Sequence, residues 1–147
     1  MPPAAFIVYE KTGQWARCLR RRLAGRAIDV HEVRNVQACR ELLSDAPKSI
    51  VAIEMAGDTL PVGQAIDRIL LLGTEFPGMK WVVLADREAQ ACEPMLRELG
   101  AVHLIASTRH IGEVADIVAK HLQNTQTVLS TSLADRLWKK IPWTNHD

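Results

Sequence analysis

The chain has 147 residues, a length that fits a single domain. Hydrophobic residues make up 48% of the chain and charged residues 24%, which is the composition of an ordinary globular protein. The 18 lysines and arginines nearly balance the 17 aspartates and glutamates. A net charge of +1 argues against a dedicated nucleic-acid-binding protein and against an acidic disordered one.

The sequence begins without a recognisable targeting signal. Met1-Pro2-Pro3 supplies no basic segment, and the apolar stretch at residues 4–9 is too short for the core of a signal peptide. The longest apolar runs fall far short of the roughly 20 residues that cross a membrane. The three cysteines have no close spacing, which is typical of reduced thiols and not of a zinc site. We therefore expect a cytoplasmic protein that binds no membrane.

Short apolar segments alternate five times with segments of helical periodicity. The predicted strands are residues 6–9, 28–33, 49–55, 81–85 and 102–106. The predicted helices are residues 15–23, 36–43, 62–76, 89–99 and 111–122. Gly25 follows the first helix, where a glycine often adopts the left-handed conformation that ends it. This alternation predicts a three-layer, doubly wound α/β fold with a five-stranded parallel sheet, and places ligand sites beyond the carboxyl ends of the strands.

The chain changes character after Leu122. Residues 123–127 are polar and uncharged, which predicts a linker, so we divide the chain into a domain at 1–123 and a linker with an amphipathic tail at 124–147. In this tail, apolar residues recur at helical spacing and two tryptophans lie near the end, a pattern typical of interface anchors. The candidate partner-binding residues here are Leu133, Leu137, Trp138, Ile141 and Trp143. The tail either packs on its own domain, pairs with a second copy or binds another protein.

Signatures of catalysis are missing from the sequence. It contains no G-x-S-x-G, G-x-G-x-x-G or G-x-x-x-x-G-K-[ST] motif, and its histidines have no metal-ligand spacing. The arginine-rich segment at residues 17–26 fits a solvated helix face or a site for an acidic partner, and the near-neutral total charge favours the first. We expect no catalytic residues, no cofactor and no nucleic-acid partner.

The alternation of strands and helices in this length, with Gly100-Ala101 before the last strand, resembles the receiver domain of bacterial response regulators. The resemblance covers residues 4–122 and implies the strand order 2-1-3-4-5. In this family an aspartate at the end of the third strand accepts a phosphoryl group. An acidic pair after the first strand holds Mg²⁺, and a serine or threonine and a lysine after the fourth and fifth strands hold the phosphoryl oxygens.

The resemblance maps this pocket onto residues that depart from the family pattern. The corresponding positions are Tyr9 and Glu10 for the acidic pair, Glu54 for the acceptor, Ala85 for the hydroxyl and Ser107 for the lysine. Leu104 stands at the family's switch aromatic, on the surface with which receivers bind partners. Glu54 is then a polar strand-end residue, a mimic of the phosphorylated aspartate or a live acceptor. Glu10 and Glu54 could also form a residual metal site, although we expect no Mg²⁺.

We therefore interpret the chain as a degenerate receiver-like domain, a non-enzymatic signalling module that is not phosphorylated. It would bind protein partners, a second copy of itself among them, through residues 90–99, 102–106 and 111–122 and through the tail. One alternative is a small flavodoxin-like enzyme or ligand-binding protein that uses the crevice at the carboxyl ends of the strands. Another is a live phosphorelay receiver with Glu54 as acceptor.

Overall fold

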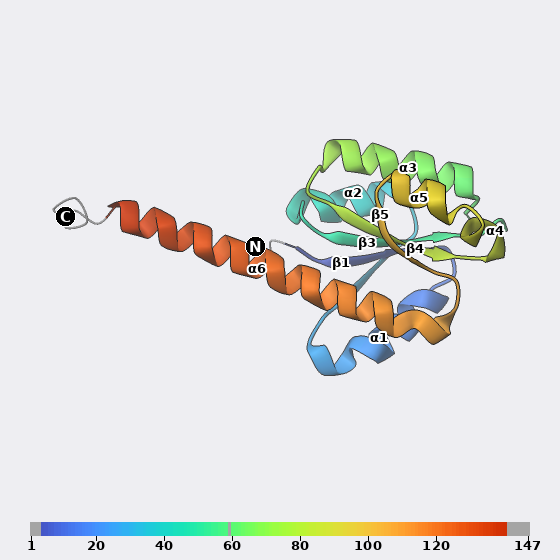
Figure 1. Cartoon of the computed structure of the whole chain (residues 1–147), viewed down its shortest axis with the longest axis horizontal. Coiled ribbons are helices and arrows are strands. Elements are labelled where there is room, and N and C mark those ends of the chain that lie inside the picture. Colours follow the sequence, from blue (N-terminus) through green and yellow to red (C-terminus); the bar gives the residue numbers. More distant parts are fainter. Residues whose placement is uncertain (1–3, 59, 141–147) are drawn as a thin grey trace.

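The protein folds into a five-stranded parallel sheet with helices on both faces (Figure 1). This computed structural model describes residues 4–58 and 60–140, with the backbone alone from residue 126 onward. The sheet has the strand order β2-β1-β3-β4-β5, as predicted. The strands are β1 (Phe6–Tyr9), β2 (Val30–Val33), β3 (Ile50–Met55), β4 (Lys80–Ala85) and β5 (Ala101–Ile105).

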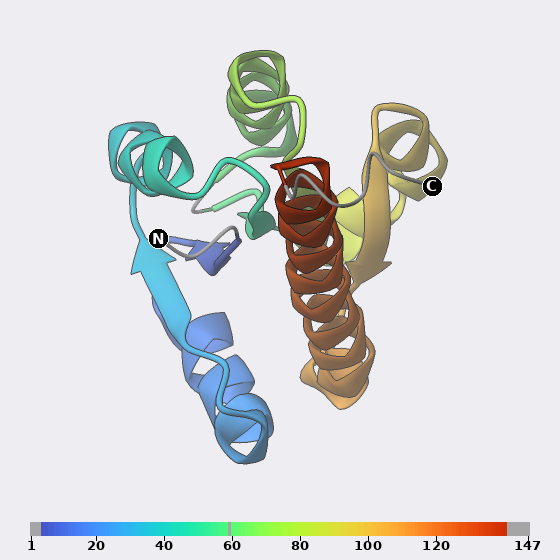
Figure 2. The same cartoon turned by 90° about the vertical axis from the view of Figure 1, so that its left-hand side faces the viewer.

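Two layers of helices enclose the sheet (Figures 1 and 2). Helices α2, α3 and α5 cover one face, with the short α4 at its end, while α1 and α6 cover the other. The helices are α1 (Gln14–Leu23), α2 (Val36–Asp45), α3 (Val62–Glu75), α4 (Arg87–Gln90), α5 (Glu93–Glu98) and α6 (Ile111–Lys140). The arrangement follows from parallel pairing, because each crossover needs a connection long enough to return to the same end of the sheet.

The central strand β3 is buried along its whole length. Its side chains alternate between two apolar clusters: Val51 and Ile53 pack toward α2 and α3, whereas Ile50 and Ala52 pack toward α1 and α6. A strand that is covered on both faces needs a nearly continuous apolar sequence, which explains the run at residues 50–53. Glu54 interrupts this run just before the carboxyl end of the strand.

The helix predicted at residues 89–99 is two short helices, α4 and α5. The chain turns at Ala91 and Cys92 and begins again at Glu93, with Pro94 in the first turn of α5. Proline has no N–H to donate and its ring displaces the preceding turn, so it is tolerated at a helix start but not in an interior. The apolar residues keep their helical spacing across residues 91 and 92, so the spacing alone does not reveal the break between the two helices.

The end of α1 also differs from the prediction. Gly25 does not adopt the left-handed conformation; the chain continues in a tight helical turn over Ala24–Arg26, and the left-handed residue is Ala27, with φ 55°. A Cβ on Gly25 would meet no atom within 4 Å. The prediction that a left-handed residue follows α1 was correct, but that residue is Ala27 and not Gly25.

The polar segment at residues 123–127 is helical, contrary to the predicted linker. Helix α6 runs without interruption from Ile111 to Lys140 and extends past the amino ends of the strands, away from the sheet (Figures 1 and 2). Polar, uncharged residues do not break a helix when they lie on its solvent side. Over the described residues, no helix combines the length and the apolar character that a membrane span requires.

Candidate functional site

The carboxyl ends of β1, β3 and β4 meet at one edge of the sheet. Strand register sets Tyr9 opposite Ile53, and Met55 opposite Ala85. Glu54, the last but one residue of β3, therefore lies near the end of β1. This edge is the crevice where open parallel sheets bind ligands.

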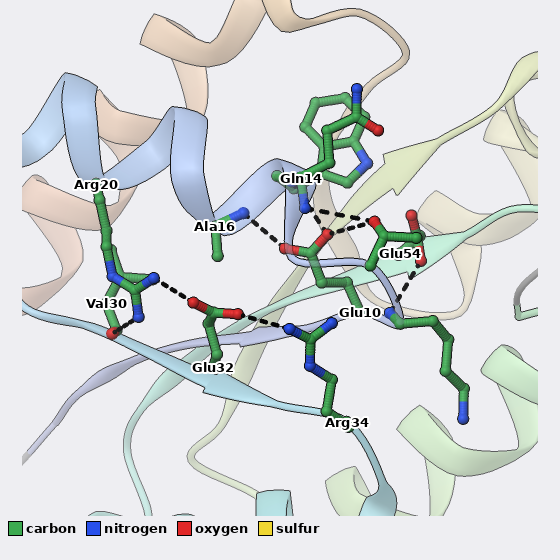
Figure 3. Close-up of polar contacts among 11 residues, drawn as sticks. Glu10, Gln14, Ala16, Arg20, Val30, Glu32, Arg34 and Glu54 are labelled. Carbon is green, nitrogen blue, oxygen red and sulfur yellow. Dashed lines mark hydrogen bonds and ion pairs between the residues drawn. The ribbon is translucent and has the colours of Figure 1, made fainter.

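Glu10, the first residue after β1, is completely buried and caps the start of α1 (Figure 3). Its Oε2 accepts the N–H of Ala16 at 2.6 Å, and its Oε1 accepts the N–H of Trp15 at 3.0 Å and the Thr12 hydroxyl at 3.4 Å. The residue in the N-cap position, Gly13, has no side chain that could satisfy these donors. The carboxylate thus replaces the missing cap and also lies at the positive end of the helix dipole.

Glu54 is nearly buried, with 6% of its surface exposed, and its side chain turns toward the loop after β1. Its Oε1 accepts the backbone N–H of Lys11 at 3.2 Å (Figure 3). A carboxylate near the end of β3 therefore holds the first turn of the chain after β1. Glu10 and Glu54 both take part in shaping the β1–α1 loop.

Tyr9 lies on the opposite face of the sheet from this carboxylate pair. It is fully buried in the cluster beneath α2 and α3, and its hydroxyl accepts a hydrogen bond from Nη1 of Arg68 at 3.1 Å. Successive residues of a strand point to opposite faces, so Tyr9 and the residue after it diverge. The position expected to carry half of an acidic pair therefore carries a core aromatic residue with its own hydrogen-bond donor.

Asp86, directly after β4, joins two loops of the same edge. Its Oδ1 accepts the N–H of Ala89 at 2.8 Å and caps α4, while its Oδ2 accepts the N–H of Gly57, in the loop after β3, at 2.9 Å. These backbone donors hold the pKa of the Asp86 carboxyl below its ordinary value, the Ala89 bond contributing most. Asp86 thus ties the loop after β3 to the start of α4.

The two remaining pocket positions carry no group aimed at a phosphoryl oxygen. Ala85 has only a methyl group and is 3% exposed. Ser107 caps the tight turn at Thr108–His110 by accepting the N–H of Arg109 at 3.2 Å. A hydroxyl that accepts from its own turn stabilises the start of that turn.

The predicted partner surface is apolar and exposed at some positions but not at Leu104. Leu104 is 7% exposed and belongs to the core, where it also borders a pocket of about 450 Å³ next to α4. Three exposed apolar side chains lie within the predicted ranges 90–99 and 102–106: Met95 at 43%, Leu99 at 37% and Val102 at 40%. Met95 lies on α5 and Leu99 directly follows its last residue.

The structure describes only the backbone of the predicted tail anchors. Leu133, Leu137 and Trp138 lie on the part of α6 that extends beyond the sheet (Figure 1). The predicted contacts of Ile141 and Trp143 lie outside the described residues.

The arginine-rich segment at residues 17–26 is partly neutralised within the fold. Arg20 forms an ion pair with Glu32 on β2, and Arg26 pairs with Asp116 on α6 at 2.7 Å. Both pairs are substantially exposed to solvent, where such pairs contribute little to stability. This surface agrees with the interpretation as a solvated helix face.

Among the side chains that the structure describes, residues 4–58 and 60–125, no group of three or more histidines, cysteines, aspartates or glutamates could hold a metal ion. A cluster of titratable groups joins β5 to α6: Glu113 lies 2.8 Å from Nε2 of His103 and 2.7 Å from Nδ1 of His110. The hydrogen bond from His103, followed by that from His110, lowers the pKa of the Glu113 carboxyl. Burial raises the pKa of the Cys39 thiol to about 12, so this cysteine is unreactive near neutral pH.

Comparisons with known proteins find the same fold in solved receiver domains. The receiver domain of nitrogen regulatory protein C superposes with a TM-score of 0.67 at 15% identity, covering 86% of this chain and 99% of that one. A response regulator receiver domain protein from Clostridium thermocellum gives 0.66 at 13% identity, covering 86% and 98%. A streptococcal redox sensor described as evolved from two-component response regulators gives 0.63 at 17% identity, covering 86% and 55%.

At these identities the likeness is one of fold. No family model matches the sequence. No curated protein matches it either. The chain therefore has the flavodoxin-like fold of response regulator receiver domains, with the predicted strand order and a C-terminal helix longer than predicted.

Proposed function

We propose that this protein is a receiver-like signalling module that binds protein partners and does not take up a phosphoryl group. The observation that carries the proposal is the hydrogen bonding of Glu10. Both of its oxygens accept N–H groups from the first turn of α1, so the one carboxylate retained from the acidic pair is already committed to capping a helix.

The remaining residues of the crevice do not fit the Mg²⁺ that phosphoryl transfer in receivers requires. Mg²⁺ demands an octahedral set of oxygen ligands and loses its water reluctantly. Here Tyr9 packs on the other face of the sheet, and an ion at Glu10 would compete with the N–H groups of Trp15 and Ala16 for the carboxylate oxygens. Leaving those donors unsatisfied costs about 1–3 kcal/mol each.

The acceptor position supports the same conclusion. Glu54, which the family resemblance assigns to the position of the acceptor aspartate, accepts the Lys11 N–H. At the positions that would bind phosphoryl oxygens, Ala85 offers only a methyl group, and Ser107 has a neutral hydroxyl, which accepts the Arg109 N–H, where the family has a lysine. Glu54 then serves as a fixed anion that holds the β1–α1 loop.

Two surfaces support a partner-binding role. The first is the pair of exposed apolar side chains Met95, on α5, and Leu99, directly after it. The second is the C-terminal part of α6, where the sequence has Leu133 and Leu137 one helical turn apart on a segment that leaves the domain (Figure 1). Helices that project an apolar stripe from a domain commonly pair with another helix, so a second copy of this chain is one of the expected partners.

The test is a titration of the ¹⁵N-labelled protein with Mg²⁺ and then with beryllofluoride, a mimic of a bound phosphoryl group. We expect no saturable shifts at the amides of Lys11, Gly57, Asp86 and Ser107 at millimolar ligand. A phosphorylatable receiver domain treated in parallel provides the positive control. Saturable shifts confined to these loops and abolished by Glu54→Gln would instead establish a live receiver with Glu54 as acceptor.

A second experiment tests the ligand-binding alternative. A flavodoxin-like protein that uses this crevice would carry a tightly bound organic molecule through purification. We expect mass spectrometry of the denatured protein to find none, and a stoichiometric small molecule whose removal shifts the amides of these loops would contradict the proposal.

A further inference from the structure

The opposite edge of the sheet has a pocket of its own. Its volume is about 450 Å³, and it lies between α6 and the amino ends of β3, β4 and β5. Ile50, Val102 and Ile117 supply its apolar side chains. The full length of the sheet separates this pocket from Glu10 and Glu54, since those residues lie at the carboxyl ends of the strands.

Three lysines from three different segments line this pocket. Lys48 precedes β3, Lys80 begins β4 and Lys120 lies on α6. All three are exposed, and no acidic residue lines the pocket with them. Like charges gathered in a hollow with apolar walls raise the local positive potential, because field lines are focused by the low-dielectric surroundings.

None of these lysines is neutralised by the fold. Among the described side chains, every ion pair uses an arginine or a histidine as the cation, and Lys48, Lys80 and Lys120 take part in none. The contrast with the arginine-rich segment is informative, since Arg20 and Arg26 each have an acidic partner. The net charge of the chain is only +1, so three lysines without acidic partners around one pocket are a local excess of positive charge. Such an excess favours the binding of an anion.

The pocket has an ordered frame. Nε2 of His121 lies 2.7 Å from the carbonyl oxygen of Lys48. A carbonyl only accepts hydrogen bonds, so Nε2 carries the proton and donates it. This bond ties α6 to the turn before β3 and keeps the lining of the pocket from the helix and from the sheet together.

We propose that this pocket binds a small organic anion whose phosphate or carboxylate group pairs with Lys48, Lys80 and Lys120. An apolar part of the same molecule would pack on Val102 and Ile117. Small-molecule sites generally combine an apolar lining with a few convergent polar groups, which is the composition found here.

Binding at this place would act on α6. The residues of α6 that line the pocket, at positions 117, 120, 121, 124 and 125, follow the spacing of a single helix face. They lie at the point where α6 leaves the sheet (Figure 1). A bound anion would therefore fasten the helix to the amino edge of the sheet just before the segment that projects from the domain.

The test is a titration of the full ¹⁵N-labelled chain with 1-naphthyl phosphate, 1-naphthoate and inorganic phosphate. We expect saturable shifts of the amides of Val102, Ile117 and His121 with a naphthyl anion, and weaker binding at higher salt. Tighter binding of the naphthyl phosphate would identify a phosphate-bearing ligand, and tighter binding of the naphthoate a carboxylate-bearing one. Inorganic phosphate should bind more weakly than either, because it offers nothing to the apolar side chains.

Matched substitutions locate the site. We expect Lys80→Gln and Lys120→Gln each to weaken binding about threefold, and the double variant about tenfold, as for exposed ion pairs. Arg21→Gln removes the same charge from an exposed position on α1 and should leave the affinity unchanged. The proposal is overturned if neither naphthyl anion causes saturable shifts at millimolar concentration, if the double variant binds as tightly as the parent, or if inorganic phosphate binds as tightly as the naphthyl anions.

This outcome is independent of the beryllofluoride titration. The two experiments report on amides at opposite edges of the sheet, so failure of one proposal is distinguishable from failure of the other.

Discussion

The Glu10 carboxylate and the Ala16 amide are joined by a hydrogen bond of 2.6 Å across the turn between β1 and α1. Both residues are fully buried. This bond makes the carboxylate at the edge of the sheet a structural element, because it satisfies a helix donor that water cannot reach. Whether a substitution of Glu10 raises or lowers the free energy of unfolding therefore tests this role.

Replacing Glu10 should destabilise the protein. Glu10→Ala removes the acceptors of the Trp15 and Ala16 amides, and we expect a loss of about 2 kcal/mol in the free energy of unfolding, measured by urea denaturation. Glu10→Gln retains one acceptor oxygen and should cost about 1 kcal/mol. If Glu10 instead belonged to a cluster of carboxylates that binds Mg²⁺, Glu10→Gln would raise the free energy of unfolding. The reason is that neutralising one carboxylate of such a cluster relieves repulsion in the absence of the ion.

Glu98→Gln is the matched control for Glu10→Gln. Glu98 is exposed on α5, and the same substitution there should change stability by less than about 0.5 kcal/mol. An increase in stability for Glu10→Gln, with Glu98→Gln neutral, would contradict the capping role.

The Asp86 bridge predicts a pH-dependent contribution to stability. Its pKa is lowered in the folded protein, so the ionised form is stabilised by folding. This contribution is complete above the ordinary pKa of 3.8 and is lost as the pH falls through the lower folded value. Asp86→Ala should therefore cost about 1 kcal/mol at pH 7, with the difference from the parent shrinking below pH 4.

The variant Asp86→Asn distinguishes the contribution of the negative charge from that of the hydrogen bond that caps α4. Asparagine is a good N-cap residue, so this variant should retain most of the stability at pH 7. Urea denaturation of the three proteins between pH 3 and 7 provides the measurement. A cost of Asp86→Ala that stays constant over this range would show that the ionised carboxylate is not the group that matters.

The conformations of Gly25 and Ala27 predict two stabilising substitutions. Gly25→Ala should raise the free energy of unfolding by about 0.5–1 kcal/mol, because Gly25 has ordinary backbone angles and open space around its Cβ position. Ala27→Gly should also stabilise, by about 1 kcal/mol, because it relieves a left-handed residue that carries a Cβ. If Gly25 were instead the left-handed residue, Gly25→Ala would destabilise the protein in the same urea experiment.

The projecting part of α6 predicts self-association of the full chain. Leu133→Lys should weaken a dimer at least tenfold in sedimentation equilibrium, since burying a leucine contributes about 1.5–3 kcal/mol and each tenfold change in affinity is about 1.4 kcal/mol. Thr131→Lys adds the same charge about half a turn away on the helix and should leave the dimer intact. A parent chain that remains monomeric over the whole concentration range would exclude a second copy as the partner.

Much of the fold was predictable from the sequence because its signals are local. Continuous apolar runs such as residues 50–53 predict buried parallel strands, and the alternation with helical periods predicts the layers. The elements that were predicted wrongly depend on single residues whose effect varies with context. Pro94 divides a periodic segment into α4 and α5, and the polar residues 123–127 continue α6 instead of ending it.

The sequence by itself determined the class of fold, the position of Glu54 near the carboxyl end of the third strand and the absence of recognisable catalytic motifs. It also placed Tyr9 and Ala85 at the carboxyl ends of their strands, and Glu10 and Ser107 in the loops that follow the first and fifth strands. These conclusions rest on periodicity and on the order of residues along the chain, which local chemistry governs.

Only the tertiary structure decided what the side chains do. The capping of α1 by Glu10, the bridge from Asp86 to Gly57 and the gathering of Lys48, Lys80 and Lys120 around one pocket all join segments that are separated along the chain or turned in a particular direction. Hydrogen bonds and charge interactions act over a few ångströms in space. The distances that determine them exist only after the sheet has brought its edges together.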